Sequence, residues 1–298
     1  MSVNDELGKR MKEFYEGIPK IKLMRRTPVA VRLDGKSFHT FTYNFNKPFD
    51  HLLVQAMQET MKFLCENIQG CVFGYTQSDE ITLILVDYKK LNSSAWFDYE
   101  VQKITSIAAS MATMKFNQIF SKLVKDEGNT FEEESRKKCR DMTKEEYEAW
   151  WNSKIMPIYA HDNSAETGAM FDARCFNIPK EEVCNLIYWR QLDATRNSIQ
   201  MVGQANFPHK ELQNKSCNDI QDMLFVKKGI NWNDFPVYLK RGTACYKTED
   251  IEYTEKQLEG FRLGLPFKSV WIIDKNMPIL KGEDRIYVDK WIYYPEGE

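Results

Sequence analysis

The chain has 298 residues, of which 43% are hydrophobic and 28% are charged, and its formal net charge at pH 7 is −2. These values are typical of a soluble globular protein, and they exclude a chain-wide basic surface for nucleic acid. The longest aliphatic run, residues 81–86, is much too short to span a bilayer, and the polar N-terminus shows no signal peptide. We therefore expect a protein with no membrane contact.

The seven cysteines show no CxxC spacing, and the four histidines do not pair with them at the intervals of a zinc site. An odd count without a framework predicts reduced thiols in a cytoplasmic protein. Charge is uneven at the N-terminus, where residues 1–32 hold eight basic and four acidic side chains. This excess predicts either a surface that faces a polyanion or a solvated amphipathic helix over residues 5–17, and the sequence alone does not separate the two.

Hydrophobic periodicity and turn residues predict the elements of the first two thirds of the chain. In order they are a strand at 29–34, a helix that begins after Asp50 and ends near Asn67, a strand at 71–76, a polar tip at 77–79, a strand at 80–86, a helix at 99–123, a charged helical insertion at 124–159, a strand at 170–177 and a helix after Pro179. Without the insertion, the order is strand, helix, strand, strand, helix, strand. This is the split βαβ plan, so the predicted fold is α+β and ferredoxin-like (βαββαβ).

The C-terminal part of the chain has weaker signals. A helix is predicted to start at the capping-box-like run Ser216–Asp219 and to end at Gly229. Residues 230–241 predict an irregular segment, and the last 50 residues predict a hairpin or an edge strand. We expect a single catalytic unit over 1–298, with its core at about 22–123 and 160–202, the insertion at 124–159 and a C-terminal part at 203–298.

Asp34 stands at the end of the first buried strand and is followed by Gly35. Aspartate is depleted in strands, so two explanations compete: the pair forms a turn, or Asp34 binds a metal ion and Gly35 lets the backbone approach it. In the split βαβ plan the end of this strand lies beside the hairpin tip, which brings Asp34 near Asp79. Two neighbouring carboxylates repel unless a cation lies between them, and Mg²⁺ prefers such oxygen ligands. The pattern favours two Mg²⁺ ions that promote in-line attack on a phosphorus atom.

Side chains suited to a triphosphate lie near both carboxylates in the sequence. They are Arg32 on the same strand face as Asp34, His39 in the following turn, Lys47 before Pro48, and Ser78 beside Asp79. The carbonyl of Gly35 is a further candidate metal ligand, and Glu80 is an alternate one. Taken singly, each of these side chains has an ordinary surface or turn explanation, so the prediction depends on the pattern as a whole.

Longer motifs occur in a fixed order along the chain. They are Val31-Arg32-Leu33-Asp34-Gly35-Lys36-Ser37-Phe38-His39; Lys47-Pro48; Tyr75-Thr76-Gln77-Ser78-Asp79-Glu80-Ile81; Phe171-Asp172-Ala173-Arg174; Trp189-Arg190-Gln191; and Gly229-Ile230-Asn231-Trp232-Asn233-Asp234 with Lys240-Arg241-Gly242-Thr243. Together they resemble the signature of the tRNA(His) guanylyltransferase family. The similarity runs from about residue 5 to 243 and covers most of the chain.

The resemblance implies a polymerase-type palm with two Mg²⁺ ions that adds nucleotides in the 3′-to-5′ direction to the 5′ end of a tRNA. The RNA 5′-monophosphate is activated with ATP or GTP, and the 3′-hydroxyl of an incoming nucleotide attacks the activated phosphate. By resemblance, Asp34, Asp79 and Glu80 are catalytic; Asp34, Gly35 and Asp79 bind metal; Arg32, Lys36, Ser37, Phe38, His39, Lys47, Ser78 and Lys103 contact nucleotides; and Arg190, Asp193, Arg196 and Asn197 contact tRNA. The family also implies a homo-oligomer, a tetramer.

Two positions depart from the family pattern. Eukaryotic members carry His-Ile-Asn-Asn after an Asp-Cys pair, and at the matching run, residues 193–198, this chain has Thr195 in place of the His. A basic residue that eukaryotic members carry shortly before Lys103 falls near Glu100 here. The first departure resembles the bacterial and phage-type "like protein" branch, whose members rebuild 5′-truncated tRNAs against a template. It predicts templated repair, guanylylation of tRNA(His), or both.

Two other functions remain open on the sequence. One is another palm-type nucleotide enzyme such as a cyclase, which would react with a nucleoside triphosphate alone and would need no RNA groove. The other is a catalytically silent tRNA-binding protein. Intact Asp34 and Asp79 argue against the silent protein, because a scaffold has no use for two carboxylates that repel each other without metal.

Overall fold

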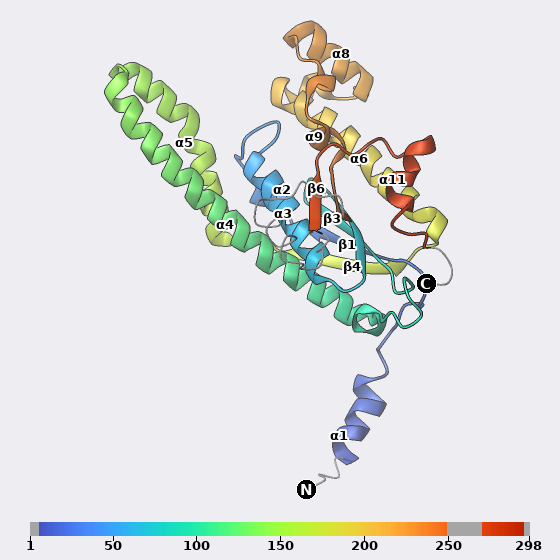
Figure 1. Cartoon of the computed structure of the whole chain (residues 1–298). Coiled ribbons are helices and arrows are strands. Elements are labelled where there is room, and N and C mark those ends of the chain that lie inside the picture. The colour runs from blue at the N-terminus through green and yellow to red at the C-terminus, as the bar shows by residue number, and fades with distance from the viewer. Residues whose placement is uncertain (1–5, 249–269, 295–298) are drawn as a thin grey trace, which may run out of the picture.

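The computed structural model describes residues 6–248 and 270–294. Its central feature in these residues is a six-stranded antiparallel sheet with the strand order β4-β1-β3-β2-β5-β6 (Figure 1). The strands are β1 (Val29–Gly35), β2 (Cys71–Gln77), β3 (Glu80–Leu85), β4 (Phe171–Asn177), β5 (Thr243–Thr248) and β6 (Val270–Asp274).

The order of the first four strands is that of the split βαβ plan, so the predicted ferredoxin-like α+β fold is confirmed. β5 and β6 extend the sheet beyond β2, and β6 forms its edge, as the edge-strand prediction for the C-terminal residues requires. Residues 249–269 and 295–298, which belong to the same prediction, lie outside the described residues. The register pairs Asp34 with Glu80 and with Asp172, which places three carboxylates in one row across the sheet.

Three helices cover the sheet: α3 (His51–Asn67), α4 (Val101–Asp141) and α6 (Lys180–Asn206). Side chains alternate between the two faces of β1, so Val31 and Leu33 join the core under α3 and α4, whereas Ala30 joins the core under α6. Asp34 shares the α6 face with Ala30. The carboxylate row therefore lies on the side of the sheet that α6 covers.

Capping residues set the boundaries of the helices. Asp50, the N-cap of α3, accepts a hydrogen bond from the backbone N–H of Leu53 at 3.0 Å. Ser216 and Asp219 form a capping box at the start of α8 (Cys217–Lys228), and Gly229 ends this helix with a φ of 66°. Both helix starts confirm their predictions.

The short helices are α2 (Phe38–Phe41), α7 (His209–Leu212), α9 (Val237–Arg241) and α11 (Ile286–Asp289), with 3₁₀ turns at Trp96–Tyr99, Trp232–Asp234 and Gly282–Arg285.

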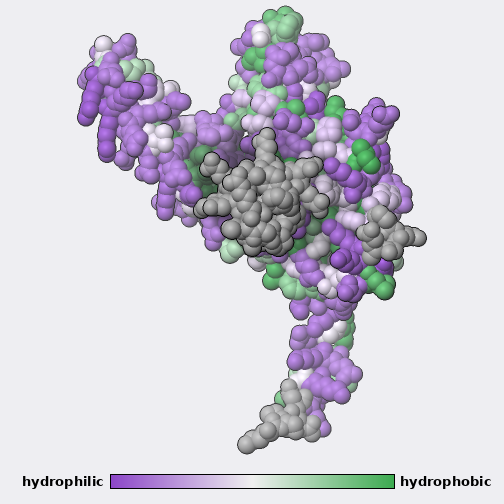
Figure 2. Space-filling view, viewed as in Figure 1, coloured by the Kyte–Doolittle hydropathy of each residue, from purple (hydrophilic) through white to green (hydrophobic). Residues whose placement is uncertain are grey.

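α4 and α5 (Lys144–Thr167) form a long helical pair that projects away from the sheet (Figure 1). The sequence predicts a helix over 99–123 followed by a separate insertion, whereas α4 continues unbroken to Asp141. Gly128 does not interrupt it, because one glycine in a long helix destabilises by only about 1 kcal/mol. Hydrophilic residues cover most of the projecting part, as Figure 2 shows.

The N-terminal helix α1 (Glu6–Met11) continues into a π-helical turn, Lys12–Glu16, and neither segment buries a residue. This confirms the helix that the sequence predicts near 5–17. Figure 1 shows it extended away from the sheet. No helix among the described residues has the length and apolar character needed to cross a membrane.

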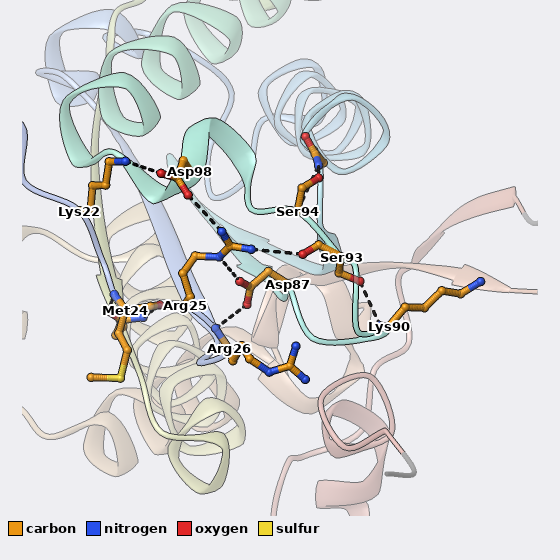
Figure 3. Close-up of polar contacts among 11 residues, drawn as sticks. Lys22, Met24, Arg25, Arg26, Asp87, Lys90, Ser93, Ser94 and Asp98 are labelled. Carbon is orange, nitrogen blue, oxygen red and sulfur yellow. Dashed lines mark hydrogen bonds and ion pairs between the residues drawn. The ribbon is translucent and has the colours of Figure 1, made fainter. Parts of the chain in front are cut away.

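Two acidic side chains fix the segment before β1 to the rest of the protein (Figure 3). Asp87, buried just after β3, accepts hydrogen bonds from Arg25 Nε at 2.5 Å and from the backbone N–H of Arg26 at 2.8 Å. Asp98 accepts from Arg25 Nη1 at 3.0 Å and also pairs with Lys22. This charged cluster lies where β3 ends, opposite to Glu80 at its start, so it is separate from the predicted site.

Candidate active site

A cavity of about 490 Å³ lies where the β2–β3 hairpin tip meets the segment that follows β1. Its wall includes many of the residues that the sequence predicts for metal and nucleotide binding: Gly35, Ser37, Phe38, His39, Lys47, Ser78 and Asp79. Thr42, Phe45, Asn46, Pro48, Asp50, Leu53 and Met201 complete the wall. The fold thus brings two distant motifs together and places Lys47 beside both.

The backbone at the junction is held in an unusual conformation. The N–H of Gly35 donates to the carbonyl of Asp79 at 3.1 Å, which joins the end of β1 to the hairpin tip. Ser37 and Ser78 have φ values of 56° and 49°, in the left-handed region that residues other than glycine rarely adopt. Such conformations cost on the order of 1–3 kcal/mol and cluster at ligand sites. Both serines line the cavity, so two strained backbone positions lie in its wall.

Gly35 lies directly against the ring of Phe38. A Cβ at Gly35 would stand 2.2 Å from Cδ2 and 2.4 Å from Cε2 of Phe38. The ring has little room to move, since it packs against Phe41, Phe116 and Phe171 with centroid distances of 5.0, 5.7 and 5.3 Å. Packing alone therefore requires glycine at this position.

Replacing Gly35 with Ala is expected to lower the free energy of unfolding by about 1–3 kcal/mol and to weaken nucleotide binding, because Phe38 and the turn above it must shift. Thermal unfolding and calorimetric titration with GTP measure the two effects. Gly128→Ala is the matched control: its added methyl meets nothing within 4 Å, and it should stabilise α4 by up to about 1 kcal/mol without changing binding. Similar behaviour of the two variants would contradict the packing argument.

Asp34 and Asp79 lie close enough for their charges to interact. Burial raises the pKa of Asp79 above its usual value, and the charges of Asp34 and Glu80 raise it further. Burial also raises the pKa of Asp34, followed by the charges of Glu80 and Asp172. Both carboxylates are thus ionised at an energetic cost, which a cation between them would relieve.

The donor set at this junction fits Mg²⁺. Among the residues that the structure describes, no group of three or more His, Cys, Asp or Glu side chains is arranged to hold a metal ion. Mg²⁺ does not require such a cage, because it binds through one or two carboxylates and completes its coordination with water and substrate phosphates. Asp34, Asp79 and the carbonyl of Gly35 offer oxygen ligands only, which suits a hard cation.

Glu80 belongs to a buried ion network on the α6 face. Its Oε1 accepts from Arg32 at 2.9 Å (Nε) and 2.7 Å (Nη2), and its Oε2 accepts from Gln77 Nε2 at 2.6 Å and from Arg190. The Arg32 guanidinium also lies over the ring of Trp189, 5.5 Å from its centroid. In this arrangement Glu80 joins the strands to α6, and Arg32 is held by Glu80 and does not line the cavity. The roles that the sequence predicts for both residues stay predictions.

Lys36 and Lys103 are also absent from the cavity wall. Phe171, which pairs with Gly35 at the cavity end of the sheet, donates its N–H to Thr113 Oγ1 at 3.1 Å. Lys103 lies ten residues before Thr113 on α4, or roughly 15 Å along the helix. Lys36 and Lys103 therefore do not line this cavity within one chain, and their nucleotide contacts stay predictions.

A family model described as tRNAHis guanylyltransferase (Thg1) matches residues 8–179. This match covers more than half of the chain. The chain belongs to the Thg1 tRNAHis guanylyltransferase family. The resemblance seen in the sequence motifs is therefore confirmed. The predicted enzyme class is confirmed as well, because the members of this family are nucleotidyltransferases.

Solved structures and curated proteins of the family are similar over most of this chain. A bacterial tRNA(His) guanylyltransferase (Thg1)-like protein in complex with ATP is 39% identical and has a TM-score of 0.71, over 97% of this chain and 100% of that one. A bacterial Thg1-like protein in complex with GTP is 37% identical, with a TM-score of 0.69 and the same coverage. The tRNA(His) guanylyltransferase of Kluyveromyces lactis is 25% identical over 253 residues, 80% of this chain and 90% of that protein. The expected similarity to the bacterial branch of the Thg1 family is confirmed.

Two acidic residues of this Thg1 family member, one in the cavity wall and one beside Asp34 in the sheet, were not predicted from the sequence to lie there. Asp50 was identified only as an N-cap, yet it lines the cavity, and its nearness to Lys47 in the sequence was the available signal. Asp172 stands opposite Asp34, is exposed and pairs with Arg174 at 3.1 Å. Its motif was visible in the sequence, but only the register of β4 on β1 reveals its place.

A smaller, apolar pocket of about 90 Å³ adjoins the cavity and shares Asp50, Leu53, Ser78 and Met201 with it. Asn197 of α6 lies in its wall, together with Gln58 and Thr243, whose side chains are hydrogen-bonded at 2.9 Å. This pocket extends the cavity toward α6.

The α6 residues expected to contact tRNA differ in exposure. Asn197 lines the smaller pocket. Arg196 leaves 61% of its side chain exposed and pairs with Asp193, whereas Arg190 leaves only 7% exposed and is held between Glu80 and Asp193. Arg190 therefore has a structural contact here, its predicted tRNA contact stays a prediction, and Arg196 is the accessible cation of the group.

Proposed function

We propose that this Thg1 family member is a Mg²⁺-dependent 3′-to-5′ nucleotidyltransferase that adds nucleotides to the 5′ end of tRNA. The observation that carries the proposal is the composition of the cavity wall. Lys47, His39 and Ser78 surround the junction of Gly35 and Asp79. A lysine and hydroxyl donors suit triphosphate oxygens, and a carboxylate and a carbonyl suit the cation that accompanies them.

The reaction has two phosphoryl-transfer steps. An oxygen of the RNA 5′-monophosphate attacks the α-phosphorus of ATP or GTP, and pyrophosphate leaves. The 3′-hydroxyl of an incoming nucleoside triphosphate then attacks the activated 5′-phosphorus, and the nucleoside monophosphate leaves. Asp34, Asp79 and the Gly35 carbonyl would hold two Mg²⁺ ions, which supply Lewis-acid stabilisation of the phosphate charge. Lys47, His39 and Ser78 bind and orient the triphosphate.

The residue at position 195 supports a proposal for the tRNA substrate. Thr195 stands where eukaryotic members carry a histidine, so this position has no imidazole. Its hydroxyl donates to the carbonyl of Gln191 in the same helix at 2.9 Å. We propose that the enzyme repairs 5′-truncated tRNAs against a template in the cytoplasm, with or without guanylylation of tRNA(His). Exposed apolar side chains of the N-terminal segment, Phe14, Tyr15 and Ile18, support association into a homo-oligomer, a tetramer by family resemblance.

Incubation with labelled nucleoside triphosphates tests the proposal, with full-length tRNA(His) compared with a 5′-truncated tRNA of another identity. Addition to the truncated tRNA is expected, and changing the opposing template base should change the nucleotide that is added. Addition to tRNA(His) alone, whatever the opposing base, would refute the repair reaction. Consumption of a triphosphate without any RNA would instead indicate a cyclase-like enzyme.

A further inference from the structure

His161 of α5 is buried between two carboxylates that come from different helices. Its Nδ1 lies 2.6 Å from Glu127 Oε2 of α4, and its Nε2 lies 2.8 Å from Asp50 Oδ2 at the N-cap of α3. No part of His161 is exposed. The edges of the Phe45 and Phe120 rings close the site, with centroids 4.5 and 6.1 Å from the imidazole. The three helices therefore meet at one hydrogen-bonded centre around a buried imidazole.

The geometry favours a doubly protonated imidazole. A neutral imidazole has one N–H, and it could donate to only one of the two carboxylates, whereas the imidazolium donates to both. Burial lowers the pKa of His161, but the hydrogen bonds and charges of Asp50 and Glu127 together outweigh burial and raise this pKa to about 9. The raised pKa favours a protonated His161 at neutral pH, held between the two carboxyl groups.

The same oxygen of Asp50 reaches the cavity. Oδ2 accepts hydrogen bonds from the backbone N–H of Asn46 at 3.1 Å and from its side-chain amide at 3.2 Å. Asn46 immediately precedes Lys47, and both residues line the cavity. His161 thus contacts the cavity wall directly at Asp50 and Phe45, and it reaches Asn46 through Asp50.

A second contact from α5 fixes the other end of this wall segment. Ser164, one turn after His161, donates its hydroxyl to the carbonyl of Phe41 at 2.6 Å. His161 and Ser164 are the buried residues of α5, and both are polar. A helix that only completed a core would bury apolar side chains at such a contact. α5 instead meets the cavity segment, residues 41–50, through directed hydrogen bonds at both ends.

We propose that His161 is a positioning residue for nucleoside triphosphate binding: through Asp50 and Asn46 it holds Lys47 in place, so that the α4–α5 pair sets the affinity of the cavity for the triphosphate. The inference rests on the proposed function, since it takes this cavity as the nucleotide site. It assigns the helical pair a role in nucleotide affinity.

His161→Gln tests this, because the amide keeps one donor but carries no charge. The Kd for GTP without RNA and the KM for GTP should both rise roughly tenfold, the factor that corresponds to 1.4 kcal/mol, while kcat changes little. His161→Phe keeps a ring but no donor, so it should have a larger effect. Ser164→Ala, which loses one contact at the far end of the segment, should have a smaller one.

Tyr147→Phe is the matched control. It removes the hydroxyl contact of 2.7 Å between Tyr147 and Ser135, which joins the same two helices away from the cavity, and should change neither Kd nor KM. If the His161 variants do not fold, Glu127→Gln keeps the shape of the side chain and removes one counter-charge, and its Kd for GTP should also rise. A folded His161→Gln or Glu127→Gln variant with the wild-type Kd and KM would overturn this inference and leave the proposed function in place. A wild-type chain that binds no GTP would overturn the proposed function as well.

Discussion

Asp79→Asn and Asp34→Asn are each expected to reduce nucleotide addition by at least about a hundredfold while the protein stays folded and binds tRNA. Asparagine has the same shape but lacks the charge that would hold a cation against the triphosphate. Burial and neighbouring carboxylates raise the pKa of both residues, so neutralising either one relieves repulsion and should not lower stability. Single-turnover addition of labelled GTP, thermal unfolding and tRNA binding by filter retention measure the three quantities.

Asp172→Asn provides the control for these variants. Asp172 stands in the same row as Asp34, but it is more exposed and its carboxylate pairs with Arg174. It should retain most of the activity. Full activity of Asp34→Asn or Asp79→Asn would refute the two-carboxylate site, and loss of tRNA binding would point to a role in RNA contact instead.

The part of this site that the sequence predicts depends on local pattern and on topology. Alternating apolar residues that end at Asp34 and Gly35 predict a buried strand with a carboxylate at its end. The polar tip at 77–79 predicts a hairpin, and the split βαβ plan then brings strand end and tip together. No step in this argument needs a side-chain contact, which is why it agrees with the observed sheet.

Side-chain partners could not be predicted in the same way. Alternation placed Arg32 on the face of Asp34, but its partner is Glu80, and that contact depends on the register of β1 and β3. Lys103 sits on a helix of 41 residues, and only the packing of α4 on β4 shows how far it is from the cavity. His161 and Asp50 are 111 positions apart, so neither periodicity nor motif spacing could join them. Such contacts are decided by tertiary packing.

Arg190→Met is expected to lower the free energy of unfolding by about 3 kcal/mol, because it leaves a buried carboxylate without one of its partners. The Arg190 guanidinium contacts Glu80 and lies 2.7 Å from Asp193, with 7% of its side chain exposed. Methionine keeps much of the length of the side chain but supplies neither charge nor donor. The loss should fall at the low end of the range for buried pairs, since Arg32 remains bonded to Glu80. Urea denaturation measures it.

Arg196→Ala separates a structural role on α6 from an RNA-binding one. Arg196 shares Asp193 with Arg190, but 61% of its side chain is exposed, so its loss should cost less than about 1 kcal/mol of stability. If Arg196 contacts a tRNA phosphate, its loss should weaken tRNA binding and lower the slope of log affinity against log salt by roughly 0.7–0.9. Arg190→Met, measured below its unfolding transition, should keep the wild-type slope. The reverse result, with a changed slope for Arg190→Met alone, would place the buried arginine at the RNA and contradict the division of roles along this helix.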